Sequence, residues 1–542
     1  MPPTSLHWYA LYPSVATFLC LKPEYTILNS YAATVILACV LITIARLVTY
    51  LTLYPEFFTP MKEIPTPGDR SWLTGNSKTY FLEFPFKRME NWIRTVKNDG
   101  LIRYYMVGNL ERIMLTTPES LSEVLSKKTY DFPKPQGIRE SLERVTGHGV
   151  LLAEGDDHKM QRKNLMPAFS YRHIKDLYPI FWSKSVEMVK LIEKELGEAS
   201  DNVIQVSNWA SRATLDIIGI AGMDYDFDSL NHPQNSLNKQ YRRLLTEPTV
   251  TMKIVFLLGM MTNSIRLVQS LPFRQNKEIA EASKVIRSTA LQVIRTKKEK
   301  LEKDPTSQAG VDIISVALKH GNVFTDQNLV DQMMTFIGAG HETTSTALQW
   351  SVYALCKHPD VQTRLREEVR ANLPPISPEH QFPVSAATLD SLPYLNAVCN
   401  EVLRYYPSIP MTARIANKDT TLVGKPIPKG TFILVVPQII NRTEALWGPD
   451  ADKFDPERWL GPGKANTGGA VSNYAFLSFI HGPRSCIGQG FAKAELACLV
   501  AATVGRFKME LKYPDAELEV RRGPTVSPKD GVLAKFTPLE GW

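Results

Sequence analysis

The sequence "FIHGPRSCIGQG" at residues 479–490 places Cys486 directly before the helix-like run "FAKAELACLV". Gly482 and Pro483 indicate a tight turn ahead of the cysteine, and Gly488 allows the backbone to come close to another group. The N-terminus of the following helix carries a partial positive charge that stabilises an anion. A buried free thiol is the more common role of a cysteine, but this setting favours a bound thiolate.

The composition is that of a globular protein with a substantial core. Of the 542 residues, 44% are hydrophobic and 22% are charged, and the formal net charge is +7. These values exclude disordered and fibrous proteins. The basic residues form no long tract interleaved with aromatic residues, so we expect a docking face or a membrane-adjacent surface and no nucleic-acid partner.

The six cysteines are scattered along the chain. None lies in a Cys-x2-Cys pair or beside a His-x3-His spacing, so the sequence predicts neither a zinc site nor a disulfide framework. This usage favours a reducing compartment for the main domain. The cysteines are Cys20, Cys39, Cys356, Cys399, Cys486 and Cys498.

The N-terminal region, residues 1–54, carries the pattern of a membrane anchor. Residues 31–54 contain a single charged side chain, Arg46, and are long enough to cross a hydrocarbon core of about 30 Å as a helix. No cleavage pattern clearly follows, so we expect an anchor rather than a removed signal peptide. The apolar stretch 8–21 is interrupted by Pro13, and it is either a second short membrane segment or an interfacial one.

The remaining chain divides into a connector and one large domain. The prolines within residues 55–76 predict a stiff, poorly helical connector, and we expect residues 77–542 to form one large domain. Helical periodicity dominates and strand-like runs are short, which predicts a mainly α fold with small β-sheets. The apolar run 252–261 is either a buried helix or a segment that dips into the bilayer. The helical runs are 172–196, 276–303, 326–358 and 359–373, and the strand-like runs are 100–108, 112–117 and 431–438.

These features together resemble the cytochrome P450 family, the haem-thiolate monooxygenases. The spacing of Phe479, Gly482, Arg484, Cys486 and Gly488 is similar to the haem-binding loop of that family. The resemblance implies a cytochrome P450 fold that follows a transmembrane helix, with haem b as the cofactor. It also implies that Cys486 is the axial iron ligand, a thiolate that favours O–O cleavage and whose pKa the helix N-terminus lowers. Arg484 would pair with a haem propionate.

The motif "GAGHETTS" lies inside the long helical run. Gly338 and Gly340 each cost ~1 kcal/mol relative to alanine within a helix, so close helix packing or a functional need must offset them. Ala339-Gly340-x-Glu342-Thr343 resembles the oxygen-binding helix of the family, in which a local distortion opens a groove above the iron. The resemblance implies that Thr343 supplies a hydroxyl to bound oxygen and that Glu342 feeds the proton relay.

Three charged residues resemble a buried triad that supports the haem loop in the family. Glu401 and Arg404 lie three residues apart, hence on one face of a helix, and Arg458 follows in "FDPERWLGPG". Buried charges persist only when they are paired with one another, so we expect the three residues to act together.

A further stretch, "EGDDHKMQRKNLMPAFS", is similar to the proximal-side pattern G-x-x-W-x-x-x-R, with Gly155 and Arg162 in register. His158 stands where the family has tryptophan, and its ring N–H can donate the same hydrogen bond to a propionate. Arg414 matches another propionate-binding arginine of the family. The resemblance therefore implies that His158, Arg162 and Arg414 contact the haem.

The resemblance covers roughly residues 65–540 and implies insertion of one oxygen atom from O2 into an apolar organic substrate. Electrons would come from NADPH through a flavoprotein, NADPH–cytochrome P450 reductase, and cytochrome b5 is a second candidate donor. Lys159, Lys163 and Lys493 are the candidate docking face for an acidic donor. A single N-terminal anchor would hold the protein on the endoplasmic reticulum membrane, with the catalytic domain in the cytosol.

The cysteine loop and the ending "TPLEGW" are most similar to filamentous-fungal members of secondary metabolism. Two other functions stay open at this point: a haem-thiolate isomerase or dehydratase that works on a peroxide without a reductase, and a non-catalytic haem-binding protein. Glu342 and Thr343 argue against both, because an acid and a hydroxyl beside bound oxygen serve protonation. The sequence does not identify the substrate.

Overall fold

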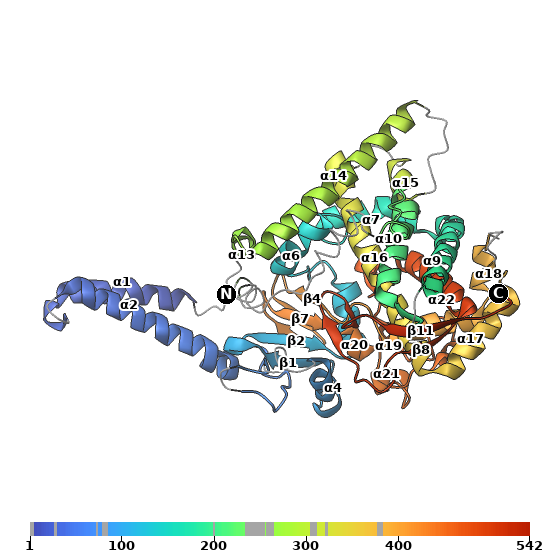
Figure 1. Cartoon of the computed structure of the whole chain (residues 1–542). Helices are drawn as coiled ribbons and strands as arrows, with labels where there is room; N and C mark the ends of the chain where they lie inside the picture. Colours follow the sequence, from blue (N-terminus) through green and yellow to red (C-terminus); the bar gives the residue numbers. More distant parts are fainter. Residues whose placement is uncertain are drawn as a thin grey trace. The chain divides into compact units, whose positions relative to one another are not determined.

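The computed structural model describes residues 5–26, 30–71, 74–77, 85–198, 201–233, 255, 259, 265–303, 312–319, 324–376 and 383–542. The chain divides into two compact units: unit 1 comprises Met1–Pro133 and Thr412–Ile439, and unit 2 comprises Lys134–Met411 and Ile440–Trp542. The predicted fold class is confirmed, since helices dominate and the sheets are small (Figure 1). Of the apolar run 252–261, all but Val255 and Gly259 lie outside the described residues.

Unit 1 is built on a four-stranded sheet in the order β1-β2-β7-β4. β1 pairs with β2 and β4 pairs with β7 in antiparallel fashion, whereas β2 and β7 run parallel. Every residue of β1 is buried, as expected for an apolar and aromatic strand. The three strand-like runs of the sequence therefore form strands. The elements of this part are α4 (Pro85–Thr95), β1 (Leu101–Tyr105), β2 (Glu111–Leu115), α5 (Pro118–Ser122), β4 (Thr412–Ile415), β5 (Thr420–Leu422), β6 (Lys425–Ile427) and β7 (Phe432–Val435).

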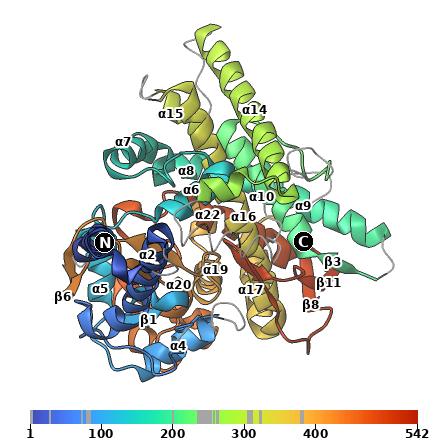
Figure 2. The same ribbon diagram turned by 90° about the vertical axis from the view of Figure 1, so that its left-hand side faces the viewer.

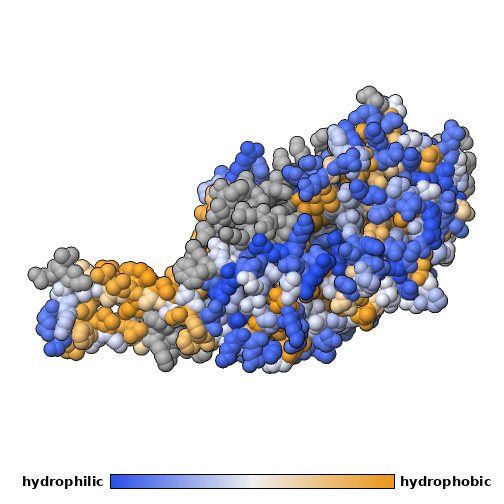
Figure 3. All heavy atoms as spheres, turned by 90° about the horizontal axis from the view of Figure 1, so that it is seen from below, coloured by the Kyte–Doolittle hydropathy of each residue, from blue (hydrophilic) through white to orange (hydrophobic). Residues whose placement is uncertain are grey.

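Two apolar helices at the start of unit 1, α1 (Ser5–Leu21) and α2 (Tyr31–Val48), pack against each other as a hairpin (Figure 1). The Tyr12 hydroxyl lies 3.0 Å from the Thr43 hydroxyl. Figure 3 shows hydrophobic residues over most of the visible face of this hairpin. Within the described residues, α2 is the one helix long and apolar enough to cross a membrane. Helical backbone continues beyond it as a π-helix over Thr49–Phe58, past the expected end at Tyr54.

Unit 2 is organised around α16, a helix over Asp326–Lys357 that begins with a capping box formed by Thr325 and Asn328. α10 lies along it, and α6, α14 and α22 also contact it (Figures 1 and 2). α22 begins at Gln489, directly after the cysteine loop, and packs against α9 and α16. The helices of this unit are α6 (Gln136–Thr146), α7 (Gly155–Leu165), α8 (Tyr171–Ile174), α9 (Tyr178–Glu198), α10 (Val206–Met223), α13 (Ile265–Ser270), α14 (Arg274–Lys303), α15 (Ile313–Lys319), α16, α17 (Pro359–Asn372), α18 (Ala386–Asp390), α19 (Pro393–Tyr405), α21 (Glu444–Trp447) and α22 (Gln489–Arg506).

The strands of unit 2 form two small antiparallel sheets. One has the order β3-β11-β8, and the other is a hairpin of β9 and β10 in which Val526 pairs with Arg522. These strands are β3 (Val203–Gln205), β8 (Phe507–Leu511), β9 (Val520–Arg522), β10 (Val526–Pro528) and β11 (Leu533–Pro538). The β9–β10 hairpin reaches the central helix α16, which gives it a place near the candidate site.

Candidate active site

The cysteine loop forms a tight turn over Gly482–Arg484 ahead of α22. Gly482 has a φ of +78°, a conformation that favours glycine. The Cys486 N–H donates to the Phe479 carbonyl at 2.8 Å, which fixes the cysteine backbone just before the helix. At Gly488 an added Cβ would lie 3.8 Å from the Phe169 ring, an ordinary contact, so packing within the protein does not require a glycine there.

The Cys486 side chain is exposed to a cavity of unit 2, but protein atoms surround it closely enough that burial raises the pKa of the thiol. The Gly488 N–H and the Arg162 guanidinium act in the opposite direction and only partly offset burial. The helix N-terminus therefore acts on the thiol in the expected direction, but burial outweighs it and the net pKa is raised in the polypeptide alone. A bound metal ion would favour the thiolate of Cys486, because coordination deprotonates a thiol.

The cavity lies between the cysteine loop and α16. Ala339, Gly340 and Thr343 of α16 line it, and so do Cys486 of the cysteine loop and Phe491 of α22. Apolar side chains make up most of the lining, which suits a hydrophobic cofactor and substrate. The lining residues are Lys134, Val150, Leu151, His158, Arg162, Phe169, Ile218, Thr335, Phe336, Ala339, Gly340, Thr343, Thr344, Arg484, Ser485, Cys486, Ile487, Gly488, Phe491 and Ala492.

Basic side chains gather in the same cavity. The Arg162 guanidinium donates to Ser485, with 2.6 Å between Nη1 and the carbonyl oxygen and 3.2 Å between Nη2 and Oγ. Arg484 forms an ion pair with Glu154, whose other carboxylate oxygen accepts the Lys134 N–H at 2.9 Å. Thus α7 and the residue before it are bonded to the cysteine loop at two points.

His158 also lines the cavity and is only 2% exposed. Burial lowers the pKa of His158 to about 4, and the positive charges of Arg484, Lys134 and Arg162 act in the same direction. The imidazole is therefore neutral at neutral pH and carries one ring N–H to donate.

These residues fit a haem by the chemistry of their donors. A thiol faces the cavity, the walls are apolar, and Arg162, Arg484 and the neutral His158 supply hydrogen-bond donors for the two carboxylates of a haem. Arg414 lies in unit 1, on β4, where its Nη1 donates to the Thr412 hydroxyl at 3.0 Å and to the Ala413 carbonyl at 2.8 Å. Its contact with a propionate stays a prediction.

The oxygen-binding motif lies on α16 with Thr343 toward the cavity. The Thr343 hydroxyl donates to the Ala339 carbonyl at 2.7 Å. An added Cβ at Gly340 would come within 3.1 Å of Ile218 on α10, so close helix packing accounts for this glycine. His341 is buried against α10, with its Nε2 3.3 Å from the Ser211 hydroxyl, so its role is in packing.

Glu342 is not among the residues that line the cavity. Its carboxylate oxygen Oε1 accepts hydrogen bonds from Arg521 Nη2 and from the Thr525 hydroxyl, each at 3.0 Å. Sequence reasoning missed both partners. They lie far along the chain in the β9–β10 hairpin, and no local pattern links them to the motif.

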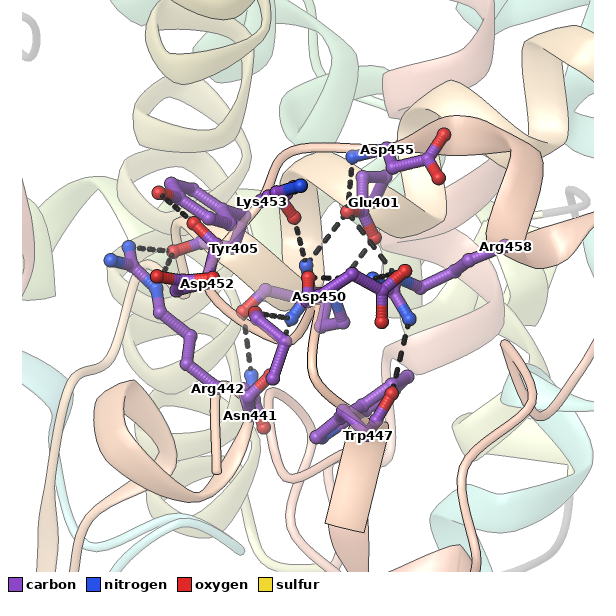
Figure 4. Close-up of polar contacts among 12 residues, drawn as sticks. Glu401, Tyr405, Asn441, Arg442, Trp447, Asp450, Asp452, Lys453, Asp455 and Arg458 are labelled. Atoms are coloured by element: carbon purple, nitrogen blue, oxygen red, sulfur yellow. Dashed lines mark hydrogen bonds and ion pairs between the residues drawn. The ribbon is translucent and has the colours of Figure 1, made fainter. Parts of the chain in front are cut away.

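Glu401, Arg404 and Arg458 lie together, as the resemblance implies. Figure 4 shows Glu401 and Arg458 of this cluster. Arg404 makes two bonds to the Glu401 carboxylate, at 2.7 and 2.8 Å, and both side chains are fully buried. Arg458 Nε lies 3.6 Å from Glu401 Oε1, a looser ion pair. Two further donors to Glu401 were not predicted from the sequence: the Trp459 indole N–H at 2.9 Å and the Asp455 N–H at 2.7 Å.

The three candidate docking lysines differ in exposure. Lys159 and Lys163 are exposed, and Lys159 pairs with Asp156 at 2.7 Å. Lys493 is half-buried over the Phe476 ring, and burial lowers its pKa to about 8. Lys493 is therefore less suited to a docking face than the two lysines of α7.

Comparison with known proteins agrees with this geometry. The sequence profile of the cytochrome P450 family matches residues 65–533. The chain is 57% identical over 531 residues to cytochrome P450 monooxygenase sphH of Aspergillus fumigatus, and the match covers 97% of each chain. It is 43% identical to cytochrome P450 monooxygenase FSL4 of Gibberella zeae, with 91% of each chain covered, and 40% identical to cytochrome P450 monooxygenase FUM15 of Gibberella moniliformis, with 92% of each chain covered.

Proposed function

Because the chain belongs to the cytochrome P450 family and is one of its monooxygenases, we propose that it oxidises an apolar organic substrate in fungal secondary-metabolite biosynthesis. The observation that supports this most directly is that Cys486 and Thr343 line one cavity. The haem implied by the family, when bound, supplies the iron at which O2 is activated. One oxygen atom enters the substrate, and the other leaves as water with two electrons from NADPH and two protons.

Several residues of the cavity would hold the cofactor. Cys486 Sγ would bind the iron, and the two bonds from Arg162 to Ser485 hold the residue before it in place. Arg484 and His158 line the cavity and would donate to the carboxylates of the cofactor. Since charge-assisted hydrogen bonds are stronger than neutral ones, these donors would orient the cofactor as well as retain it.

Thr343 and Glu342 would handle protons at the α16 wall of the cavity. The Thr343 hydroxyl lies at the cavity wall and is held by the Ala339 carbonyl, so its oxygen can accept a hydrogen bond from a bound group or water. Glu342 is the neighbouring acid and lies outside the cavity lining. A proton supplied through Glu342 would therefore enter the cavity at the Thr343 hydroxyl.

Membrane attachment and electron supply complete the proposal. α2 would anchor the protein to the endoplasmic reticulum membrane with the catalytic domain in the cytosol. NADPH–cytochrome P450 reductase would be the electron donor and cytochrome b5 a second one, with exposed Lys159 and Lys163 as part of the docking face.

The test is the absorption spectrum of the reduced protein with carbon monoxide, followed by turnover. Thiolate ligation shifts the main band to longer wavelength, so Cys486→Ala should lose the shifted band, whereas Cys356→Ala should keep it. A histidine-type spectrum in fresh wild-type protein would contradict the assignment. Product formed with a peroxide but not with NADPH and the reductase would favour the isomerase or dehydratase alternative. The metabolite that accumulates when the gene is deleted identifies the substrate.

A further inference from the structure

The carboxylate of Glu342 is held from outside the cavity by a strand hairpin. Both donors to Glu342, Arg521 and Thr525, belong to the segment that runs from β9 into β10. Glu342 is 8% exposed, whereas the Arg521 side chain is 31% exposed and so reaches solvent. Arg521 and Thr525 therefore lie between the Glu342 carboxylate and the protein surface.

The hairpin is fixed to α16 at further points. The Trp350 indole N–H donates to the Val526 carbonyl at 2.8 Å, two helical turns beyond Glu342. The Val526 N–H donates to the Ser408 carbonyl at 3.0 Å, and the Ser408 hydroxyl donates to the Thr343 carbonyl at 2.9 Å. These bonds fix the position of the hairpin on α16. They therefore also fix the positions of its side chains relative to Glu342.

Both donors use the same oxygen of Glu342. Within the described part of the chain, Arg521 and Thr525 bond to Oε1, which leaves Oε2 as the oxygen that can exchange a proton. A charged donor and a hydroxyl on one oxygen restrict rotation of the carboxylate and hold Oε2 in one orientation. An ion pair that served stability alone would contribute little at this exposure, since partly exposed pairs are weak.

We propose that Arg521 and Thr525 are positioning residues for the proton supply, which hold Glu342 so that Oε2 takes protons from the solvent side of α16. This inference rests on the proposed function, in which Glu342 feeds protons toward Thr343. The β9–β10 hairpin would therefore influence whether O2 is reduced to hydrogen peroxide or to water, although none of its residues is among those that line the cavity.

The experiment follows substrate-free NADPH consumption by the haem-loaded full chain with a flavoprotein NADPH reductase. Reduction of O2 to hydrogen peroxide takes one NADPH and two protons in total, whereas reduction to water takes two NADPH and four protons. Poorer proton supply therefore raises the share of peroxide. We expect Arg521→Gln to raise the peroxide-to-water ratio by about threefold, a factor in keeping with a partly exposed ion pair.

The conservative variant Arg521→Lys should restore most of the wild-type ratio, and Thr525→Val should raise the ratio less than Arg521→Gln does. The matched control is Lys529→Gln, which removes a positive charge at the end of the same hairpin, where Lys529 pairs with exposed Glu519 at 2.5 Å. This control should leave the ratio unchanged. An equal rise in Lys529→Gln, or none in Arg521→Gln, would overturn the inference.

A second readout does not depend on turnover. Hydrogen–deuterium exchange of the haem-loaded protein should be faster over Val520–Pro528 in Glu342→Gln and in Arg521→Gln than in wild type, and unchanged in Arg521→Lys. Should Arg521→Gln fail to bind haem, Thr525→Val decides the question by the same two measurements. If a variant keeps the carbon monoxide band but changes neither the peroxide-to-water ratio nor the hydrogen–deuterium exchange, the positioning role alone is contradicted. If wild-type protein lacks that band, the proposed function itself is contradicted.

Discussion

Arg162 on α7 binds the residue immediately before Cys486, with its guanidinium Nη1 2.6 Å from the Ser485 carbonyl oxygen and Nη2 3.2 Å from the Ser485 hydroxyl. The resemblance assigned Arg162 to the haem. In the structure it also ties the proximal helix to the cysteine loop, so it can act on the thiolate through the position of the loop.

We expect Arg162→Gln to weaken thiolate ligation. Loss of a charged donor to a backbone carbonyl costs about 1.5–3 kcal/mol, which loosens the loop that presents Cys486. The shifted carbon monoxide band should lose intensity on standing, while a band near the histidine-type position grows. Lys163→Gln on the same helix is the control, because Lys163 is exposed, and its spectrum should match that of wild type.

Trp459 offers a test of the buried cluster that avoids an unpaired charge. Removal of Glu401 would leave Arg404 buried without its carboxylate, at a cost of about 3–5 kcal/mol. Trp459→Phe removes only the indole N–H that donates to Glu401 at 2.9 Å. We expect the free energy of unfolding to fall by about 1.5–3 kcal/mol, measured by urea titration of the haem-loaded protein.

The control for Trp459 is Glu457→Gln, two residues away. Glu457 pairs with Arg364, and both side chains are about half exposed. A surface pair of this kind contributes about 0–1 kcal/mol, so the urea midpoint should hardly move. Equal losses in the two variants would show that the indole N–H has no special role.

Much of the fold could be predicted because amphipathic helices repeat their apolar residues every three to four positions. α14 and α16 follow such runs closely. α10 was not predicted, since Val206–Met223 is buried on nearly every side and shows little contrast between its faces. β4 is a short strand whose place depends on pairing with β7. Neither feature leaves a local signal.

The same distinction applies to the candidate site. Cys486 and Thr343 lie in motifs with fixed local spacing, and the structure brings both to one cavity. Arg521 lies far along the chain from Glu342, and only tertiary packing joins them. Trp459 was visible beside Arg458 in the sequence, and a tryptophan next to a buried acid is a usable signal, because a buried indole N–H needs an acceptor.

Thr343→Ala tests the hydroxyl on α16. The substitution removes the bond to the Ala339 carbonyl and frees no buried charge, so haem content should match that of wild type. We expect a larger share of the consumed NADPH to end as hydrogen peroxide, because the hydroxyl beside bound oxygen is lost. Thr343→Ser keeps the hydroxyl and should stay close to wild type. Equal coupling in the alanine and serine variants would argue against a role for Thr343 in protonation.

The apolar N-terminal helices α1 and α2 can be removed, but the position of the cut matters. The Pro55 carbonyl accepts from Arg103 at 3.3 Å, and the Thr59 hydroxyl donates to Glu111 at 3.0 Å. Arg103 and Glu111 are themselves a buried ion pair on β1 and β2. A chain that begins after Thr59 leaves Arg103 and Glu111 with fewer hydrogen-bond partners.

A chain that begins at Thr49 should therefore fold and show the carbon monoxide band. A chain that begins at Lys62 should be less stable by about 1–3 kcal/mol, the cost of leaving a buried polar group unsatisfied. Thermal unfolding of the two shortened proteins provides the comparison. Identical melting temperatures would show that residues 49–61 only connect the anchor to the domain.

His158 allows a prediction with a pH dependence. The unfolded chain protonates this imidazole near its ordinary pKa, whereas burial lowers the pKa of His158 to about 4 in the folded protein. As the pH falls from neutral toward 4, the unfolded chain takes up a proton that the folded protein does not, so this residue makes the free energy of unfolding decrease. The loss is at most about 3 kcal/mol, and it is complete near the folded pKa.

We expect the urea midpoint of wild type to fall more steeply between pH 7 and pH 5 than that of His158→Phe, which cannot titrate.

The same variant tests the donor role, because phenylalanine keeps the ring and removes the N–H. Haem transfer to an acceptor apoprotein should be faster for His158→Phe than for wild type, and His158→Trp, which restores an N–H, should be slow again. Arg162 and Arg484 remain in the cavity, so the phenylalanine variant should release haem faster without being empty. Equal transfer rates for the three proteins would show that His158 fills space beside the cavity and holds no carboxylate.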